Sequence, residues 1–181
     1  IKIRSINIST DKGTIKKPVH KAFFSDKGIK EDAHSGSWHR QVSMLAIESI
    51  LRFEKVLGRP IEMGEFAENI TTEGMELYKL KPLDRFVGCH TEFEVTQIGK
   101  HCHGDGCAIF TQVGKCIMPK EGIFVRVLRQ GNLQEGDTLL YHPKVFKCKV
   151  VTLSDRAFAG EYEDVSGKLI VQLLEEYFTQ K

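Results

Sequence analysis

The chain has 181 residues, of which 41% are hydrophobic and 28% are charged, as expected for one sizeable globular domain or one domain plus a fragment. Its formal net charge of +2 is too balanced to indicate a nucleic-acid partner. The sequence contains no apolar run of about 18 residues, so we expect neither a transmembrane helix nor a membrane partner.

The cellular compartment is predicted from the N-terminus and the cysteines. Residues 1–10, IKIRSINIST, alternate apolar and polar side chains and lack the apolar core of a signal peptide. The five cysteines are an odd number, which does not favour a disulfide scaffold. We therefore expect a cytoplasmic protein with free thiols.

Residues 1–143 are predicted to be rich in short strands. KIRSINI (2–8) and TEFEVTQI (91–98) alternate apolar and polar side chains with the period of a half-buried strand. GIFVRVL (122–128) has the β-branched composition of a buried strand, and glycine-centred turns then lead to a further short strand at 138–141.

One helix is predicted among these strands, in AIESILRFEKVL (46–57). Its apolar residues fall at helical spacing, Glu48 and Arg52 form an i,i+4 pair, and Gly58 supplies the stop. Many short strands with few helices predict a mostly β fold resembling a β-barrel.

The pattern changes after Pro143. FKCKVVTLSD (146–155) reads as a continuous apolar strand, and SGKLIVQLLEEYF (166–178) reads as a helix with Ser166 as its N-cap. A strand followed by a helix opens an α/β unit, which needs a parallel partner strand. We interpret 144–181 as the truncated start of a second domain, or as a strand and helix packed on the first.

Two polar loops carry candidate binding residues. In GIKEDAHSGSWHR (28–40), glycines allow close backbone approach and Arg40 is suited to a phosphate. The alternative is a solvent loop with incidental histidines. In GEFAENITTEG (64–74), Asn69 either hydrogen-bonds a polar heterocycle or satisfies its own backbone in a turn. The basic stretch TIKKPVHK (14–21) attracts an anion or is simply a solvated face.

The stretch GKHCHGDGC (99–107) has three interpretations. Cysteines and histidines here, with Cys116, offer zinc ligands, although the spacing is not C-x2-C and no second pair exists. Alternatively, Cys102 lies among cationic neighbours that favour its thiolate, which can carry persulfide sulfur or bind molybdenum. The third interpretation is a glycine-rich loop with a spectator cysteine.

Taken in order, four segments of residues 1–142 resemble the MOSC domain family, named after the C-terminal domain of molybdenum cofactor sulfurases. They are GIKEDAHSGSWHRQVSML, GEFAENITTEGMEL, VTQIGKHC and GIFVRVLRQGNLQEGD. The family pattern has Gly-Asp before the first histidine, where this chain has Glu31-Asp32. The tail VVTLSDRAFAGEYEDVSGKLIVQLLEE resembles the first strand, loop and helix of a MoaB/Mog-type molybdopterin-binding domain.

The resemblance implies a MOSC-type β-barrel-like fold over 1–143 that binds the molybdenum cofactor (molybdopterin) or a sulfurated intermediate, without zinc. Cys102 would be the sulfur carrier or the molybdenum ligand. The residues that would line the pocket and hold the pterin phosphate are His34, His39, Arg40, Asn69 and Arg126. Arg126 interrupts an otherwise apolar strand, so it either faces inward to an anion or points to solvent.

Three functions are compatible with these features. The first is a sulfur carrier or transferase, with a sulfur donor and a molybdoenzyme as partners. The second is a molybdenum-dependent oxidoreductase that reduces N-hydroxylated compounds. The third is a non-enzymatic module that stores or escorts the cofactor.

Overall fold

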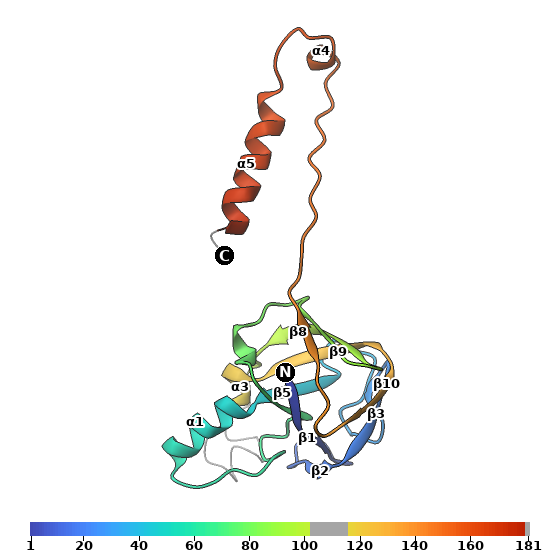
Figure 1. The fold of residues 1–181 in the computed structure, drawn as a ribbon, viewed down its shortest axis with the longest axis vertical. Coiled ribbons are helices and arrows are strands. Elements are labelled where there is room, and N and C mark those ends of the chain that lie inside the picture. The colour runs from blue at the N-terminus through green and yellow to red at the C-terminus, as the bar shows by residue number, and fades with distance from the viewer. Residues whose placement is uncertain (102–115, 180–181) are drawn as a thin grey trace. The chain divides into compact units, whose positions relative to one another are not determined.

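The structure is a computed structural model that describes residues 1–101 and 116–179 (Figure 1). The chain divides into two compact units, Ile1–Lys144 and Val145–Lys181. The first unit is mostly β, as predicted, and carries a few helices. Within the described ranges, no helix is long and apolar enough to cross a membrane.

The described strands of the first unit form two sheets. The larger is eight-stranded with the order β11-β7-β8-β9-β5-β6-β1-β2, and the smaller is three-stranded with the order β10-β3-β4. Only the β5–β6 pair is parallel among the pairs that build the larger sheet. The strands are β1 Lys2–Ile8, β2 Lys17–Val19, β3 Lys21–Ser25, β4 Gly28–Ile29, β5 Val42–Ala46, β6 Ile70–Glu73, β7 Arg85–Val87, β8 Glu92–Ile98, β9 Ile123–Arg129, β10 Gly131–Gln134 and β11 Leu140–His142.

The larger sheet does not close into a barrel, so the expectation of a barrel is corrected. Its edge strands β2 and β11 are not paired with each other in the described structure. Instead, the chain entering β11 is held against the start of β1: Ile3 N donates to Asp137 O at 2.8 Å, and Gly136 N donates to Ile3 O at 2.9 Å. A closed barrel requires a continuous ladder around the whole circumference, and these local bonds do not extend into one.

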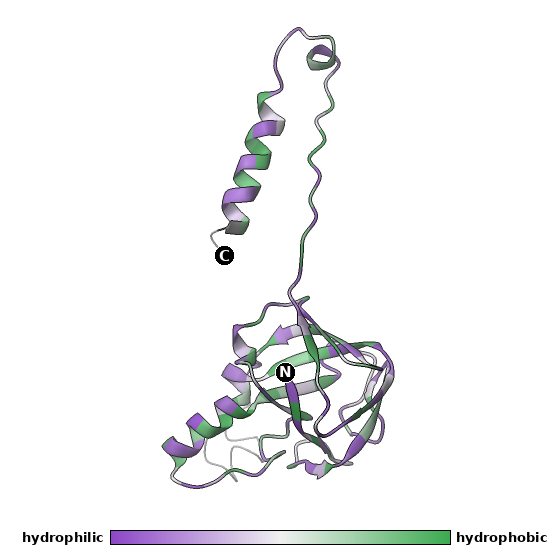
Figure 2. Ribbon diagram, in the orientation of Figure 1, coloured by the Kyte–Doolittle hydropathy of each residue, from purple (hydrophilic) through white to green (hydrophobic). Residues whose placement is uncertain are grey.

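The core lies between the sheets and follows the strand alternation. Phe93 and Val95 on β8 are fully buried, as the period-two pattern predicts. Ile3 and Ile6 on β1 are both buried although their spacing is odd, because the β1–β6 register shifts between Ile3 and Ser5. Figure 2 shows hydrophobic residues concentrated in the central strands. Burying each such side chain contributes about 1.5–3 kcal/mol.

Helix α1 (Ile47–Leu57) confirms the predicted helix and ends at Gly58, whose φ of 76° is left-handed. The predicted pair between Glu48 and Arg52 is wrong. Arg52 instead binds two carboxylates from other segments, at 2.6 and 2.8 Å, while Glu48 accepts from the Gly74 backbone N at 2.7 Å. Tertiary partners outcompete the exposed local pair, which contributes only about 0.3–0.5 kcal/mol. The other short helices are η1 (Leu77–Lys79) and α3 (Met118–Glu121).

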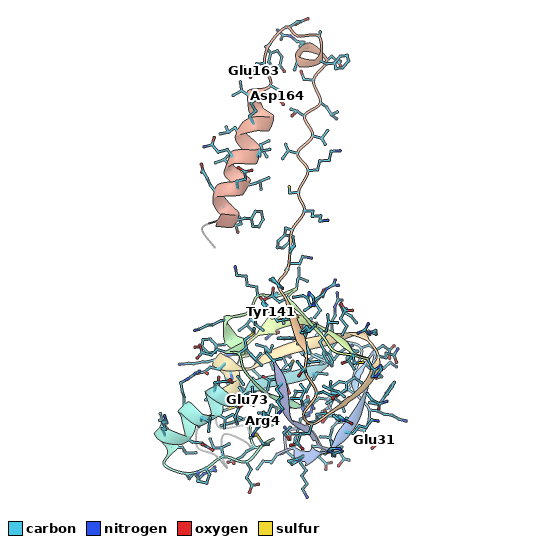
Figure 3. The ribbon with its side chains drawn as sticks, viewed as in Figure 1. Arg4, Glu31, Glu73, Tyr141, Glu163 and Asp164 are labelled. Carbon is cyan, nitrogen blue, oxygen red and sulfur yellow. The ribbon has the colours of Figure 1, made fainter. Side chains whose placement is uncertain are left out.

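The second unit contains α4 (Asp155–Phe158) and α5 (Val165–Thr179). The strand predicted at 146–155 is not formed, because no strand in the described structure pairs with this segment. The predicted helix is present as α5, but Ser166 is not its N-cap. Asp164, labelled in Figure 3, accepts from Gly167 N at 3.0 Å and caps the first turn.

Candidate functional site

A surface cleft of about 530 Å³ lies where the loop before β5 meets strands β8 and β9. His39 and Arg126, two of the predicted site residues, line it together with Trp38, Lys27 and Glu94. Arg40, His34 and Asn69 are not among its lining residues. The cleft therefore brings two of the five predicted binding residues together, and each of the other three has a different environment.

Arg40 lies beside the cleft, packed between two aromatic rings. Its guanidinium carbon is 4.6 Å from the centroid of the Trp38 ring and 5.5 Å from that of Phe124. Its Nε is buried, and no acceptor for it exists among the described residues. A buried guanidinium N–H without an acceptor is costly. Arg40 thus lies against two aromatic rings and has one buried N–H without an acceptor in the described part of the chain.

His39 is joined by hydrogen bonds to the end of β8. Its Nε2 lies 3.0 Å from Gln97 Oε1, and Gln97 Nε2 donates to the Gly99 carbonyl at 2.7 Å. Because the Gln97 amide nitrogen is committed to Gly99, its oxygen faces His39 as an acceptor, and His39 carries a proton on Nε2. The described chain continues from Gly99 to His101, the residue bonded to Cys102.

Arg126 projects from the outer face of β9, and its side chain is half exposed. Its partner is Glu94 on the neighbouring strand β8: Arg126 Nε donates to Glu94 Oε1 at 2.9 Å, and its terminal nitrogen lies 2.7 Å from the same oxygen. Arg85 approaches the other Glu94 oxygen at 3.6 Å. Arg126 therefore has its anionic partner on the neighbouring strand, in Glu94. Its side chain also lines the cleft.

His34 belongs to a second, buried cluster formed with Lys16 and Asp32. Lys16 Nζ is 2.5 Å from Asp32 Oδ2, and each side chain is only 1% exposed. Burial alone would raise the pKa of Asp32, but the hydrogen bond and charge of Lys16, with the hydrogen bond from the Ser9 backbone N–H, oppose burial, and that pKa lies well below its usual range. Burial also lowers the pKa of Lys16, against the opposing attraction of Asp32.

Backbone geometry explains how Lys16 enters the interior. Lys16 N donates to the Gly64 carbonyl at 3.0 Å. A Cβ at Gly64 would meet the Lys16 carbonyl oxygen at 2.2 Å, and the φ of Gly64 is +87°, so only glycine fits there. The interpretation of 14–21 as a solvated face is therefore wrong for Lys16, although its neighbour Lys17 is exposed.

The departure of this chain from the family pattern at Glu31 has a structural consequence. Asp32 N donates to the Ile29 carbonyl at 3.2 Å, which closes a turn whose third residue is Glu31. Glu31, labelled in Figure 3, has a φ of +72°, in the left-handed region. A turn with positive φ at its third position favours glycine, so this chain keeps the turn at the expense of local strain.

Asn69 is buried between β1 and β5 and bonded to protein atoms. Its Oδ1 accepts from Ser43 N and Ser43 Oγ at 3.1 and 3.0 Å, and its Nδ2 donates to the Asn7 carbonyl at 3.2 Å. Neither sequence interpretation of Asn69 described this arrangement. Its two side-chain polar atoms thus join the segments that carry Ser43 and Asn7.

The predicted thiol and its nearest neighbours, Cys102, His103 and Cys107, lie outside the described residues. Within residues 1–101 and 116–179, no group of three or more His, Cys, Asp or Glu side chains could hold a metal ion. Sequence reasoning missed Lys16, Trp38 and Gln97. Of these three residues, only Trp38 gave a signal in the sequence, because it is the single tryptophan and stands between His34 and His39.

Fold and cleft together define a mostly β domain with an open cleft whose lining includes Lys27 and Arg126 as well as Asp26 and Glu94. The model of the MOSC domain family matches residues 31–140, and the chain belongs to this family. This is the family linked to molybdenum cofactor-binding proteins. No curated protein matches the chain.

Solved structures share the fold. The YuaD protein from Bacillus subtilis is 20% identical with a TM-score of 0.66, and the match covers 80% of this chain and 96% of that one. YiiM from Geobacillus stearothermophilus is 24% identical with a TM-score of 0.59, covering 78% of this chain and 74% of that one. YiiM from Escherichia coli is 16% identical with a TM-score of 0.54, covering 100% and 94%.

Proposed function

We propose that the first unit binds a molybdopterin-type cofactor in the cleft and that Cys102 carries sulfur to it or ligates its molybdenum. The observation that carries the proposal is a cleft that presents Arg126 and His39, beside which the buried Arg40 Nε lacks an acceptor among the described residues. Membership of the MOSC family supports a molybdopterin-type molecule as the anion.

The residues of the cleft fit such a ligand. The cofactor combines a flat polar heterocycle with an anionic phosphate, and the cleft combines the Trp38 ring with Lys27 and Arg126. Its volume of about 530 Å³ lies within the usual range for small-molecule sites. Asp26 and Glu94 are the opposing charges in the lining, and the pairing of Glu94 with Arg126 reduces the repulsion that Glu94 would exert on a phosphate. Lys27 and Arg126 would attract the phosphate, and the Trp38 indole would pack on the heterocycle.

Hydrogen bonds from His39 through Gln97 to Gly99 connect the cleft to the stretch of sequence that precedes Cys102. These bonds link the wall of the cleft to Gly99. The described range continues through Lys100 to His101, which precedes Cys102 in the sequence. Lys100 N is itself held by the Pro119 carbonyl at 3.1 Å. The segment that carries the cysteine therefore starts from a fixed point connected to the cleft.

As a sulfur carrier, Cys102 would react as a thiolate. Its Sγ attacks the terminal sulfur of a donor persulfide, so a new S–S bond forms on Cys102 while the donor's S–S bond breaks and the donor cysteine leaves as a thiolate. Lys100 and His101 are cationic or protonatable neighbours that favour the ionised sulfur. A bound cofactor supplies a soft metal centre that accepts sulfur or a thiolate ligand.

The test is mass spectrometry of the protein as isolated, for a bound pterin and for one added sulfur atom on a single peptide. We expect both in the wild type, with the added sulfur on Cys102. We expect Cys102→Ser to abolish the added sulfur and the sulfur-transfer or reductase activity that depends on it. Cys107→Ser and Cys116→Ser serve as matched controls and are expected to retain most activity. Equal loss from all three variants with stoichiometric zinc would replace the proposal by a metal site.

The same preparations separate the three functions. Cyanide-labile sulfur on Cys102 without turnover identifies a carrier. Reduction of an N-hydroxylated compound with an artificial electron donor, lost in Cys102→Ala, identifies a molybdenum-dependent oxidoreductase. Bound pterin with neither property identifies a storage or escort module, and absence of pterin and of added sulfur refutes the proposal.

A further inference from the structure

The ring of His34 is placed between a buried cation and a buried anion. Its Nδ1 lies 3.4 Å from Lys16 Nζ and 3.5 Å from Asp32 Oδ1. The near-equal distances leave two choices for Nδ1. Either Nδ1 accepts a hydrogen bond from the Lys16 ammonium, or it carries a proton and donates a hydrogen bond to the Asp32 carboxylate. The two choices correspond to different tautomers of the neutral ring.

The hydrogen-bonding needs of Lys16 favour the first choice. An ammonium group has three protons and no lone pair, so it only donates. Asp32 Oδ2 takes one proton at 2.5 Å. A buried ammonium proton without an acceptor is costly, and the Nδ1 lone pair is a second acceptor within reach. A proton on Nδ1 would instead face the ammonium and be repelled by it.

Asp32 has hydrogen-bond donors on both oxygens without a proton from the His34 ring. Its Oδ1 already accepts from the His34 backbone N at 3.0 Å, and its Oδ2 accepts from Lys16 and from Ser9 N at 3.1 Å. Glu68 is the other ionisable group that acts on this cluster, through its attraction for Lys16.

We infer that Lys16 is a positioning residue that fixes neutral His34 with its proton on Nε2 and its Nδ1 bonded to the ammonium. The outer edge of the ring then offers an uncharged N–H donor from a partly exposed side chain. An anionic group bound beside the ring would accept from Nε2. Only this last assignment, of a ligand to His34, rests on the proposed function.

The tautomer is measured directly from two-bond ¹⁵N–¹H correlations on histidine-labelled protein at about pH 8.5, where imidazoles are neutral. The signals of His34, one of seven histidines, are assigned by their loss in His34→Gln. We expect the Nε2–H form in the wild type. In Lys16→Met, the ammonium is gone and the Asp32 carboxylate is unpaired, so we expect the proton to move to Nδ1 and bond to Asp32.

Lys17→Met is the matched control, because it removes an adjacent lysine that is exposed, and it is expected to leave His34 in the Nε2–H form. An Nδ1–H tautomer in the wild type overturns the inference, even if Lys16→Met does not fold. An unchanged tautomer in folded Lys16→Met overturns it as well. The measurement needs no ligand, so a failure of the proposed function leaves its outcome intact, and the two failures are distinguishable.

Discussion

Replacing Glu68 with glutamine should stabilise the first unit, and increasingly so as the pH rises. Glu68 is 0% exposed. Its Oε1 accepts from Gly64 N at 2.6 Å and from Thr71 Oγ1 at 3.0 Å, while its Oε2 has no partner among the described residues. Burial therefore raises the pKa of Glu68, although these hydrogen bonds oppose it. Glutamine has nearly the same shape, keeps the accepting oxygen and carries no charge.

The direction of the pH dependence follows from proton linkage. A carboxyl whose pKa is raised in the folded state gives its full contribution to stability below the unfolded pKa, about 4.3 for glutamate, and loses it as pH rises through the folded pKa. Between the unfolded and the folded pKa of Glu68, the wild type loses about 1.4 kcal/mol of unfolding free energy per pH unit at this one site. Glutamine does not titrate, so the advantage of Glu68→Gln should grow at that rate.

Urea unfolding followed by tryptophan fluorescence suits this prediction, because the single tryptophan, Trp38, lies in the first unit. The unfolding free energies of wild type and Glu68→Gln are compared from about pH 4, near the unfolded pKa of glutamate, upward to about pH 8. Glu73→Gln, which removes an exposed carboxylate, controls for the change in net charge. A pH-independent difference between Glu68→Gln and wild type would show that the Glu68 carboxylate is ionised in the fold with little penalty.

Two further predictions concern the site and the turn beside it. Adding Arg126→Gln to Glu94→Gln should weaken binding of the phosphorylated pterin by about tenfold or more, since a hydrogen bond to a charged group contributes about 1.5–3 kcal/mol. Isothermal titration calorimetry compares this double variant with Glu94→Gln alone, so that no carboxylate is left unpaired. Equal affinity of the two variants would remove Arg126 from the site. Glu31→Gly should raise the unfolding free energy by about 0.5–1 kcal/mol, because relief of the left-handed strain exceeds the entropy that glycine adds to the unfolded chain. Urea unfolding measures this difference, and a lower unfolding free energy in Glu31→Gly would contradict this account of the turn.

The elements with a strong internal period were predictable from the sequence. The period-two pattern located β8, and the helical spacing with Gly58 located α1. The strand predicted at 146–155 failed for a physical reason, since strand formation depends on a partner that no local pattern supplies. Closure of the sheet failed in the same way, because it depends on whether the first and last strands meet.

The candidate site was only partly predictable, because burial of a charged side chain has no local signature. Lys16 is enclosed because Asp32 and Gly64, distant in sequence, meet it from two other loops. Asn69 was recognised as important, but its role as a clamp on Ser43 and Asn7 follows from three segments meeting. His39 and Arg126 were predicted as binding residues, and the structure places both in one cleft, while their use in binding stays a prediction.

The buried charges have a consequence for how the site is built. Enclosing an ion pair is seldom a net gain in stability over an apolar core, because desolvation offsets the attraction. Such a cluster is better understood as specifying one arrangement of the loops it joins. Asp32 binds Ser9 N, Lys16 and His34, and the Lys16 backbone is bonded to Gly64. These contacts link three loops, one of which continues into the wall of the cleft at His39. A shift of any one loop would leave a buried charge unpaired, at a cost of several kcal/mol, so the loops must hold their positions together.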